Sequence, residues 1–270
     1  MTTLPRFGSL SGYRISPYLP AIIAVQLMIK KIFFSLYSWS VFLVLFLTHF
    51  IVASSVMWLF PKPYAAHMAI TRPFIKLIYR MHGVRLSISG LENLPKSGSF
   101  ILMANHLSLL DILTILAAVP VDFAFVGKEE LARVPILGWD MILAKHFFIR
   151  RTGGKLLRTQ MNKIQSTLEG GRPLFVFPEG SRSHTGEMSA FKNGFFNMAI
   201  AAAVPIVPCA ITGTDHILKR NSLMIHHGDI KISVGAPVLP LASSEDALEP
   251  LKEQVRRQIQ EMVDHQSSAI

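Results

Sequence analysis

Residues 100–111 of this sequence read FILMANHLSLLD. The apolar run at 100–104 is long enough for a short buried strand, and residues 109–118 carry apolar side chains at helical spacing. Asn105 and His106 lie between them, where strand gives way to helix. A strand that runs through a polar loop into a helix is the repeating unit of α/β proteins.

The same pattern continues outward along the chain, beginning with PLFVFPEGSRS at residues 173–183. Short apolar runs alternate with helical stretches, which predicts an α/β fold with a largely parallel sheet flanked by helices. The predicted strands are residues 84–89, 100–104, 122–126, 147–149, 174–177, 204–211 and 230–234. The predicted helices are residues 64–82, 109–118, 129–133, 155–168, 194–202 and 245–263.

An N-terminal hydrophobic, membrane-anchoring helical segment precedes this fold. Residues 19–29 are apolar but short, and Lys30-Lys31 are expected to interrupt the segment. Residues 32–60 hold no Lys, Arg, Asp or Glu. As one helix they extend about 43 Å, against about 30 Å of bilayer hydrocarbon. They either span the bilayer with a tilt or form a hairpin, and Pro61-Lys62-Pro63 end them.

The length and position of this segment favour a retained anchor over a cleaved signal peptide, whose apolar region is about 7–15 residues. The sequence therefore predicts two parts. Residues 1–63 form the N-terminal lead and membrane anchor, and residues 64–270 form the α/β domain.

Positive charge is concentrated in the N-terminal third of the chain. The net charge is +10, and the first acidic residue is Glu92. Basic residues beside apolar runs suit an anionic membrane surface, so we expect a lipid bilayer and no nucleic acid as partner. The basic residues before Glu92 are Arg6, Arg14, Lys30, Lys31, Lys62, Arg72, Lys76, Arg80 and Arg85.

The loop after residue 104 holds a candidate general base. Histidine is the side chain whose unperturbed pKa lies near neutrality, so an imidazole at position 106 can accept a proton from an alcohol. Asp111, five residues later in the first turn of the predicted helix, can fold back to orient the imidazole. By spacing alone, a surface histidine beside a helix-capping aspartate is the better explanation of the pair.

The loop after residue 177 holds candidate binding groups. Arg182 offers a planar fork suited to phosphate, and Gly180 allows a ligand to approach the backbone closely. An ordinary turn with a Glu179–Arg182 surface pair is the alternative.

Together these segments resemble the glycerolipid acyltransferases, and most closely the 1-acylglycerol-3-phosphate acyltransferase branch. The first segment is similar to the family's His-x4-Asp box, and the second to its Phe-Pro-Glu-Gly-Thr-Arg box, with Ser181 replacing threonine. Residues 128–139, 148–151, 191–194 and 204–208 resemble further family segments in the same order. Arg150 stands where the family usually has aspartate.

The resemblance implies an acyltransferase catalytic domain in residues 64–270 that moves a fatty acyl chain from an acyl thioester to the sn-2 hydroxyl of lysophosphatidic acid. The product is phosphatidic acid, a phospholipid precursor. His106 is expected to act as base and Asp111 to orient it. Arg151 and Arg182 are expected to bind the acceptor phosphate. By the same resemblance Glu179, Gly180 and Ser181 are also substrate-binding residues, with Glu179 either binding glycerol hydroxyls or holding Arg182 in place. The lesser candidates are Asn105, Lys128 and Lys192.

No cofactor is expected beyond the acyl donor, which is acyl-coenzyme A or acyl carrier protein. His146, His184, His226 and His227 lack the spacing of a closed metal site, so no metal is expected. The expected location is the inner or cytoplasmic membrane, with the site on its cytoplasmic side. Two alternatives stay open, namely another lysolipid acceptor such as a lyso-ornithine lipid, and a non-catalytic, membrane-anchored lipid-binding protein.

Overall fold

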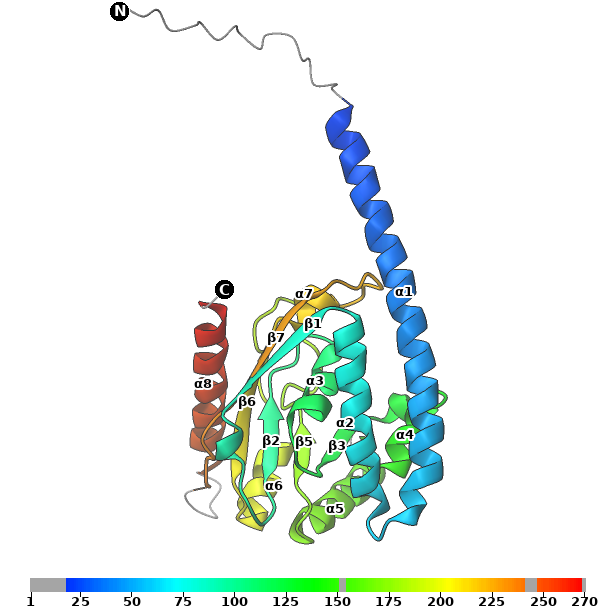
Figure 1. Ribbon diagram of the computed structural model, residues 1–270. Helices are drawn as coiled ribbons and strands as arrows, with labels where there is room; N and C mark the ends of the chain where they lie inside the picture. Colours follow the sequence, from blue (N-terminus) through cyan, green and yellow to red (C-terminus); the bar gives the residue numbers. More distant parts are fainter. Residues whose placement is uncertain (1–17, 151–153, 241–246, 269–270) are drawn as a thin grey trace, which may run out of the picture.

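A seven-stranded sheet forms the centre of the computed structural model, which describes residues 18–150, 154–240 and 247–268 (Figure 1). The strand order is β1-β7-β6-β2-β5-β3-β4. The five strands from β6 to β4 are parallel, while β7 runs antiparallel to β6 and β1 pairs in parallel with β7. The strands are β1 (Val84–Ser89), β2 (Ile101–Ala104), β3 (Ala124–Lys128), β4 (Phe147–Ile149), β5 (Leu174–Val176), β6 (Ile206–Thr212) and β7 (Gly228–Val234).

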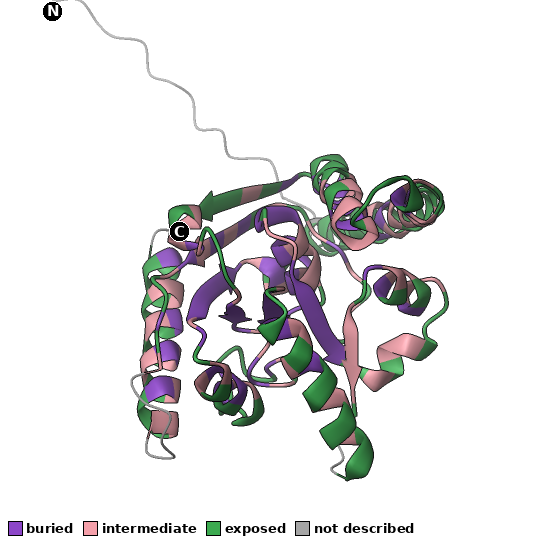
Figure 2. Cartoon of the chain, turned by 90° about the horizontal axis from the view of Figure 1, so that it is seen from below, coloured by how far each residue is buried: buried purple, intermediate pink, exposed green. Residues whose placement is uncertain are grey.

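Helices cover both faces of this sheet, which confirms the predicted fold class (Figures 1 and 2). All four residues of β2 are buried. Leu102 and Ala104 belong to one apolar cluster, and Ile101 and Met103 to the other, as alternation along a strand requires. The helices are α1 (Leu19–Val56), α2 (Pro63–Met81), α3 (Leu110–Ala118), α4 (Leu137–Leu143), α5 (Lys155–Glu169), α6 (Gly194–Ala202), α7 (Thr214–Ile217) and α8 (Leu248–Ser267).

The first helix, α1, is continuous, so the interruption expected at Lys30-Lys31 is wrong. Lysine is a good helix former, and a charged pair breaks an apolar run without breaking a helix. The chain reverses only after a 3-10 turn at Met57–Leu59, and Pro63 opens α2, which returns beside α1 (Figure 1). Residues 32–56 therefore form no hairpin of their own.

By length and composition, α1 with its following turn is able to cross a membrane. Its N-terminal part extends away from the sheet, and residues 20–33 are exposed (Figure 1). Its C-terminal part contacts the domain through buried side chains, among them Ser38, His49 and Ala53. The helix is thus free of the domain at one end and packed against α2 at the other.

Several element boundaries differ from the sequence expectation. The strand expected at 122–126 begins at Ala124, and the helix expected at 129–133 is a 3-10 turn. Helices α4 and α7 were not expected. Each is shorter than about two helical turns, which is too short for a clear apolar periodicity.

The packing of α8 on the sheet generates a stability prediction. Ile259 is fully buried in the cluster beneath that helix. Ile259→Ala is expected to lower the free energy of unfolding by about 2–5 kcal/mol, because it removes buried methyl groups and leaves a cavity. Chemical denaturation of the full chain in detergent measures the loss. Glu253→Ala, at an exposed position of α8, is the matched control and should stay within about 0.5 kcal/mol of the parent. An equal loss of unfolding free energy in Ile259→Ala and Glu253→Ala would contradict this packing.

Candidate active site

The candidate site lies at the carboxyl ends of two neighbouring strands. β2 pairs in parallel with β5, so the loops that follow them meet at one edge of the sheet. Ligands of open α/β sheets bind at that edge. The loop after β2 carries His106, and the loop after β5 carries Glu179 and Arg182. The backbone N–H of Ser183 donates to the carbonyl of His106 at 2.8 Å and joins the two loops.

His106 and Asp111 are brought together by the start of α3. Nδ1 of His106 lies 2.8 Å from Oδ2 of Asp111. The same oxygen accepts the backbone N–H groups of Leu107 at 2.7 Å and Ser108 at 2.9 Å. The other oxygen accepts the hydroxyl of Thr214 at 2.5 Å. Asp111 is fully buried and surrounded by donors, which is the environment of an ionised carboxylate.

This arrangement sets the tautomer of His106. A carboxylate that only accepts requires the proton of a neutral imidazole to sit on Nδ1. Nε2 then carries a lone pair, and the ring is 12% exposed. The ring of Phe177 stacks on it, with centroids 3.8 Å apart and planes at 9°. His106 thus has a fixed orientation and an accessible basic nitrogen, as a general base needs. Phe177 and Thr214 were missed from the sequence.

The carboxylate of Glu179 binds the backbone of the loop that carries His106. One carboxylate oxygen accepts the backbone N–H of His106 at 2.8 Å, and the other accepts that of Ser189 at 2.8 Å. No ion pair joins Glu179 to Arg182 within the described part of the chain. The structure therefore gives Glu179 a role that the sequence did not suggest, since it holds the backbone of the base.

Arg182 and Arg220 are neighbouring positive charges at the site. Arg220 was not predicted from the sequence. The guanidinium of Arg220 donates to the carbonyl oxygens of Arg182 and Ser183. Burial lowers the pKa of Arg182, as does the charge of Arg220, while Asp111 opposes both. Among the described residues, neither arginine forms an ion pair with a carboxylate. An anion bound beside them would therefore meet uncompensated positive charge.

The remaining predicted residues divide into two groups. Gly180 has a φ of 74°, and an added Cβ there would lie 2.9 Å from Nζ of Lys192, so this lysine lies against the loop. Ser181 is exposed in the same loop. The side chain of Asn105 exchanges hydrogen bonds of 2.8 Å with the backbone of Ile211, so it joins β2 to β6 and faces away from the loops.

Two further basic residues are paired outside the site, and one is not described. Lys128 forms an ion pair with Glu130 at 2.8 Å, and Arg150 forms one with Glu129 at 2.7 Å. The charge of Arg150, at the position where an aspartate is usual, is thus held by a neighbouring glutamate. Arg151 lies outside the described residues.

An apolar cavity of about 300 Å³ adjoins this site. Leu109 and Leu110, just after the His106 loop, line one part of it, and Phe125, whose ring contacts Phe177, lines another. Helices α1 and α2 contribute Phe42 and Ile75. The cavity places apolar surface next to the loop that carries His106, so a ligand with a long apolar chain fits this arrangement.

The environment of Glu179 predicts a pH dependence of stability. Burial raises its pKa and outweighs the hydrogen bonds from Ser189 and His106. Because the folded state binds this proton more tightly, the stabilisation is complete below the unfolded-state value of about 4.3 and is lost as pH rises through the folded value.

Glu179→Gln removes this titration. The free energy of unfolding of the parent, relative to that of Glu179→Gln, is therefore expected to fall as pH rises above about 4.3. Denaturant unfolding of both proteins over a series of pH values measures the difference. A constant difference would show that the carboxyl titrates normally.

Comparison with known proteins identifies the family. A family model described as Acyltransferase matches residues 85–212. The 1-acyl-sn-glycerol-3-phosphate acyltransferase of Saccharomyces cerevisiae is 30% identical over 212 residues, covering 77% of this chain and 70% of that protein. The human 1-acyl-sn-glycerol-3-phosphate acyltransferase alpha is 29% identical, covering 70% and 68%. The crystal structure of the 1-acyl-sn-glycerophosphate (LPA) acyltransferase PlsC from Thermotoga maritima superposes with a TM-score of 0.75 at 28% identity, covering 87% of this chain and 97% of that one. The chain belongs to the glycerolipid acyltransferase family, in its 1-acylglycerol-3-phosphate acyltransferase branch.

Proposed function

We propose that this enzyme transfers a fatty acyl chain from an acyl thioester to the sn-2 hydroxyl of lysophosphatidic acid and releases phosphatidic acid. The observation that carries the proposal is the His106–Asp111 pair, with its 2.8 Å hydrogen bond through Nδ1 and its free Nε2. The names of the relatives from Saccharomyces cerevisiae and Homo sapiens support the acceptor.

The chemistry follows from the position of the proton. Nε2 of His106 accepts the proton of the acceptor hydroxyl, whose oxygen attacks the thioester carbonyl carbon. Asp111 stabilises the imidazolium that forms, since it already accepts the Nδ1 hydrogen. The tetrahedral intermediate then collapses, the carbon–sulfur bond breaks, and His106 returns the proton to the thiolate. No covalent acyl-enzyme is needed, because the acceptor oxygen is the nucleophile.

Two features of the site suit the two ends of the substrates. The guanidinium groups of Arg182 and Arg220, which form no ion pair with a carboxylate of the described residues, suit the phosphate of the acceptor, with Arg151 as a further predicted ligand. The cavity beside Leu109 suits an acyl chain, since burying each methylene is worth about 0.8 kcal/mol. A thioester carbonyl held between these features would lie near His106.

The donor and the location complete the proposal. The reaction needs no metal or redox cofactor, and either acyl-coenzyme A or acyl carrier protein supplies the thioester. We place the enzyme in the inner or cytoplasmic membrane, with its site on the cytoplasmic side, where both donors are made. Binding to an anionic bilayer is supported by the exposed apolar surface of α1 and by the basic residues Lys76 and Arg80 of α2.

Removing the base tests the reaction. His106→Ala is expected to lower kcat by about 10²–10⁴-fold with a long-chain acyl thioester and lysophosphatidic acid, because general-base catalysis is lost. Product formation in detergent or vesicles measures the rate with each donor in turn. His184→Ala, which removes an exposed histidine from the neighbouring loop, is the matched control and should keep parental activity. Full activity of His106→Ala would instead favour the non-catalytic lipid-binding alternative.

The acceptor is tested through Arg182. Arg182→Ala is expected to raise KM for lysophosphatidic acid by about 10–100-fold, because a charge-assisted hydrogen bond to phosphate is lost. Acceptors without a phosphate monoester, including monoacylglycerol and a lyso-ornithine lipid, should show little change. Arg257→Ala, an exposed arginine of α8, is the control. Parental preference for lyso-ornithine lipid over lysophosphatidic acid would overturn the acceptor assignment while leaving the base intact.

A further inference from the structure

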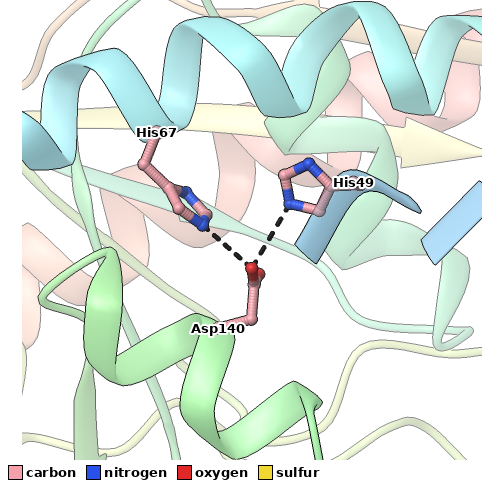
Figure 3. A group of neighbouring side chains, drawn as sticks. All are labelled: His49, His67 and Asp140. Atoms are coloured by element: carbon pink, nitrogen blue, oxygen red, sulfur yellow. Dashed lines mark hydrogen bonds and ion pairs between the residues drawn. The ribbon is translucent and has the colours of Figure 1, made fainter. Parts of the chain in front are cut away.

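Two histidines and an aspartate from three helices converge at a place that the acyl-transfer chemistry does not use. Figure 3 shows His49 of α1 and His67 of α2 pointing at Asp140 of α4. Nε2 of His67 lies 2.9 Å from Oδ1 of Asp140, and Nε2 of His49 lies 3.3 Å from the same oxygen. The three ligand atoms all lie within 4.8 Å of one another.

The cluster is removed from solvent. The side chains of His49, His67 and Asp140 are 5%, 2% and 13% exposed. His49, Thr71 and Asp140 line the apolar cavity, and His67 lies beside them through its contact with Asp140. A carboxylate so placed is costly to bury unless a positive charge compensates it. Two neutral imidazoles supply hydrogen bonds but no such charge.

The hydroxyl of Thr71 favours one tautomer of His67. This hydroxyl donates to the carbonyl of His67 at 2.8 Å, so its only hydrogen is committed and its oxygen accepts. Nδ1 of His67 lies 3.3 Å from that oxygen, which suits the tautomer with its hydrogen on Nδ1. In a neutral ring, Nε2 of His67 then turns a lone pair toward Asp140. In that tautomer a cation, either a proton or a metal ion, lies between the two.

The second histidine favours a metal ion. Nε2 of His49 lies 3.3 Å from the same oxygen and 3.4 Å from the hydroxyl oxygen of Thr71. Nδ1 of His49 is buried without a hydrogen-bond partner among the described residues, so Nε2 makes the polar contacts of this ring there. A proton bridges one pair of atoms, whereas a metal ion engages three. Ligands at about 2.0–2.2 Å in a tetrahedral site lie about 3.3–3.6 Å from one another. The 3.3 Å separation of His49 and Asp140 falls in this range, and the 2.9 Å separation of His67 and Asp140 is a few tenths of an ångström shorter.

We propose that His49, His67 and Asp140 bind one divalent transition-metal ion of the zinc class. Imidazole nitrogens with one carboxylate oxygen suit zinc and its neighbours and do not suit magnesium or calcium. Thr71 supports the site by accepting the Nδ1 hydrogen of His67, as the outer partner of a metal-bound histidine does. The ion fastens α1 to α2 and α4, far along the chain from His106, and the proposal does not depend on the acyl acceptor.

Metal content and thermal stability test the site without any assay of activity. The full chain is purified in detergent with its affinity tag cleaved, stripped with a chelator and titrated with Zn²⁺. About one tightly held ion per chain is expected, as for a single three-residue site. At a hundredfold excess over Kd, Tm should rise by about 5–10 °C.

Matched variants separate the site from general damage. His67→Gln and Asp140→Asn each remove one ligand and should bind Zn²⁺ at least about tenfold more weakly, with the rise in Tm lost. His82→Ala is the control, because this buried histidine also joins α2 to α1, through the carbonyl of Ser38 at 3.0 Å. It should lower the starting Tm and keep both the ion and the rise.

The wild-type protein alone can overturn the proposal. If the stripped and reloaded chain holds no Zn²⁺ above background and its Tm does not move, the cation between His67 and Asp140 is a proton. Zn²⁺ binding that survives in both ligand variants would equally reject these residues as the site. Neither result would affect the proposed acyl transfer, which the His106→Ala assay tests separately.

Discussion

The buried carboxylate of Asp111 is the constraint on which the catalytic end of the sheet depends. An ionised carboxylate in a fully buried position is costly to desolvate, and only a dense set of donors offsets that cost. Here those donors are the imidazole of His106, the backbone of residues 107–108 and the hydroxyl of Thr214. Because the backbone groups belong to the loop itself, the charge that orients the imidazole also shapes the loop that carries it. The base and its support are thus one hydrogen-bonded unit.

That unit explains how much of the site could be predicted from the sequence. His106 and Asp111 are five residues apart, and the strand-to-helix transition between them is visible in the apolar pattern, so their pairing is local. Phe177, Thr214 and Arg220 reach the site through strand order and loop packing, which no short-range pattern encodes. The same limit applies to Glu179, whose bond to the backbone of His106 spans 73 residues. The fold class could be predicted because it follows from the alternation of strand and helix patterns along the chain. Helices α4 and α7 could not be predicted, because they are too short to show an apolar periodicity.

The effect of a basic residue on the site depends on its partners in the fold and not only on its presence in the sequence. Arg150 and Lys128 add positive charge to the sequence, but each is neutralised by a glutamate of the 129–133 turn. Arg182 and Arg220 add no more charge in number, yet they stand together without carboxylate partners among the described residues. Exposed ion pairs contribute little to stability, typically about 0–1 kcal/mol, so the pairs at Lys128 and Arg150 are better understood as removing charge from the site edge. The positive charge at the site therefore comes from Arg182 and Arg220, which have no carboxylate partner among the described residues.

Helix α1 and the candidate active site are connected through the loop that carries Arg220. At one end of this loop, the carbonyl of Leu218 accepts the hydroxyl of Ser108, next to the catalytic histidine loop. At the other end, the indole of Trp39 on α1 donates to the carbonyl of Leu223 at 2.8 Å. Ser35, one turn earlier on α1, accepts the backbone N–H of Ile225 at 3.0 Å. Arg220 is therefore held between α1 and the base, so a displacement of α1 from the domain would move the guanidinium that borders Arg182. An anchor that only tethered the enzyme would need none of these contacts, and their presence makes α1 a structural part of the site.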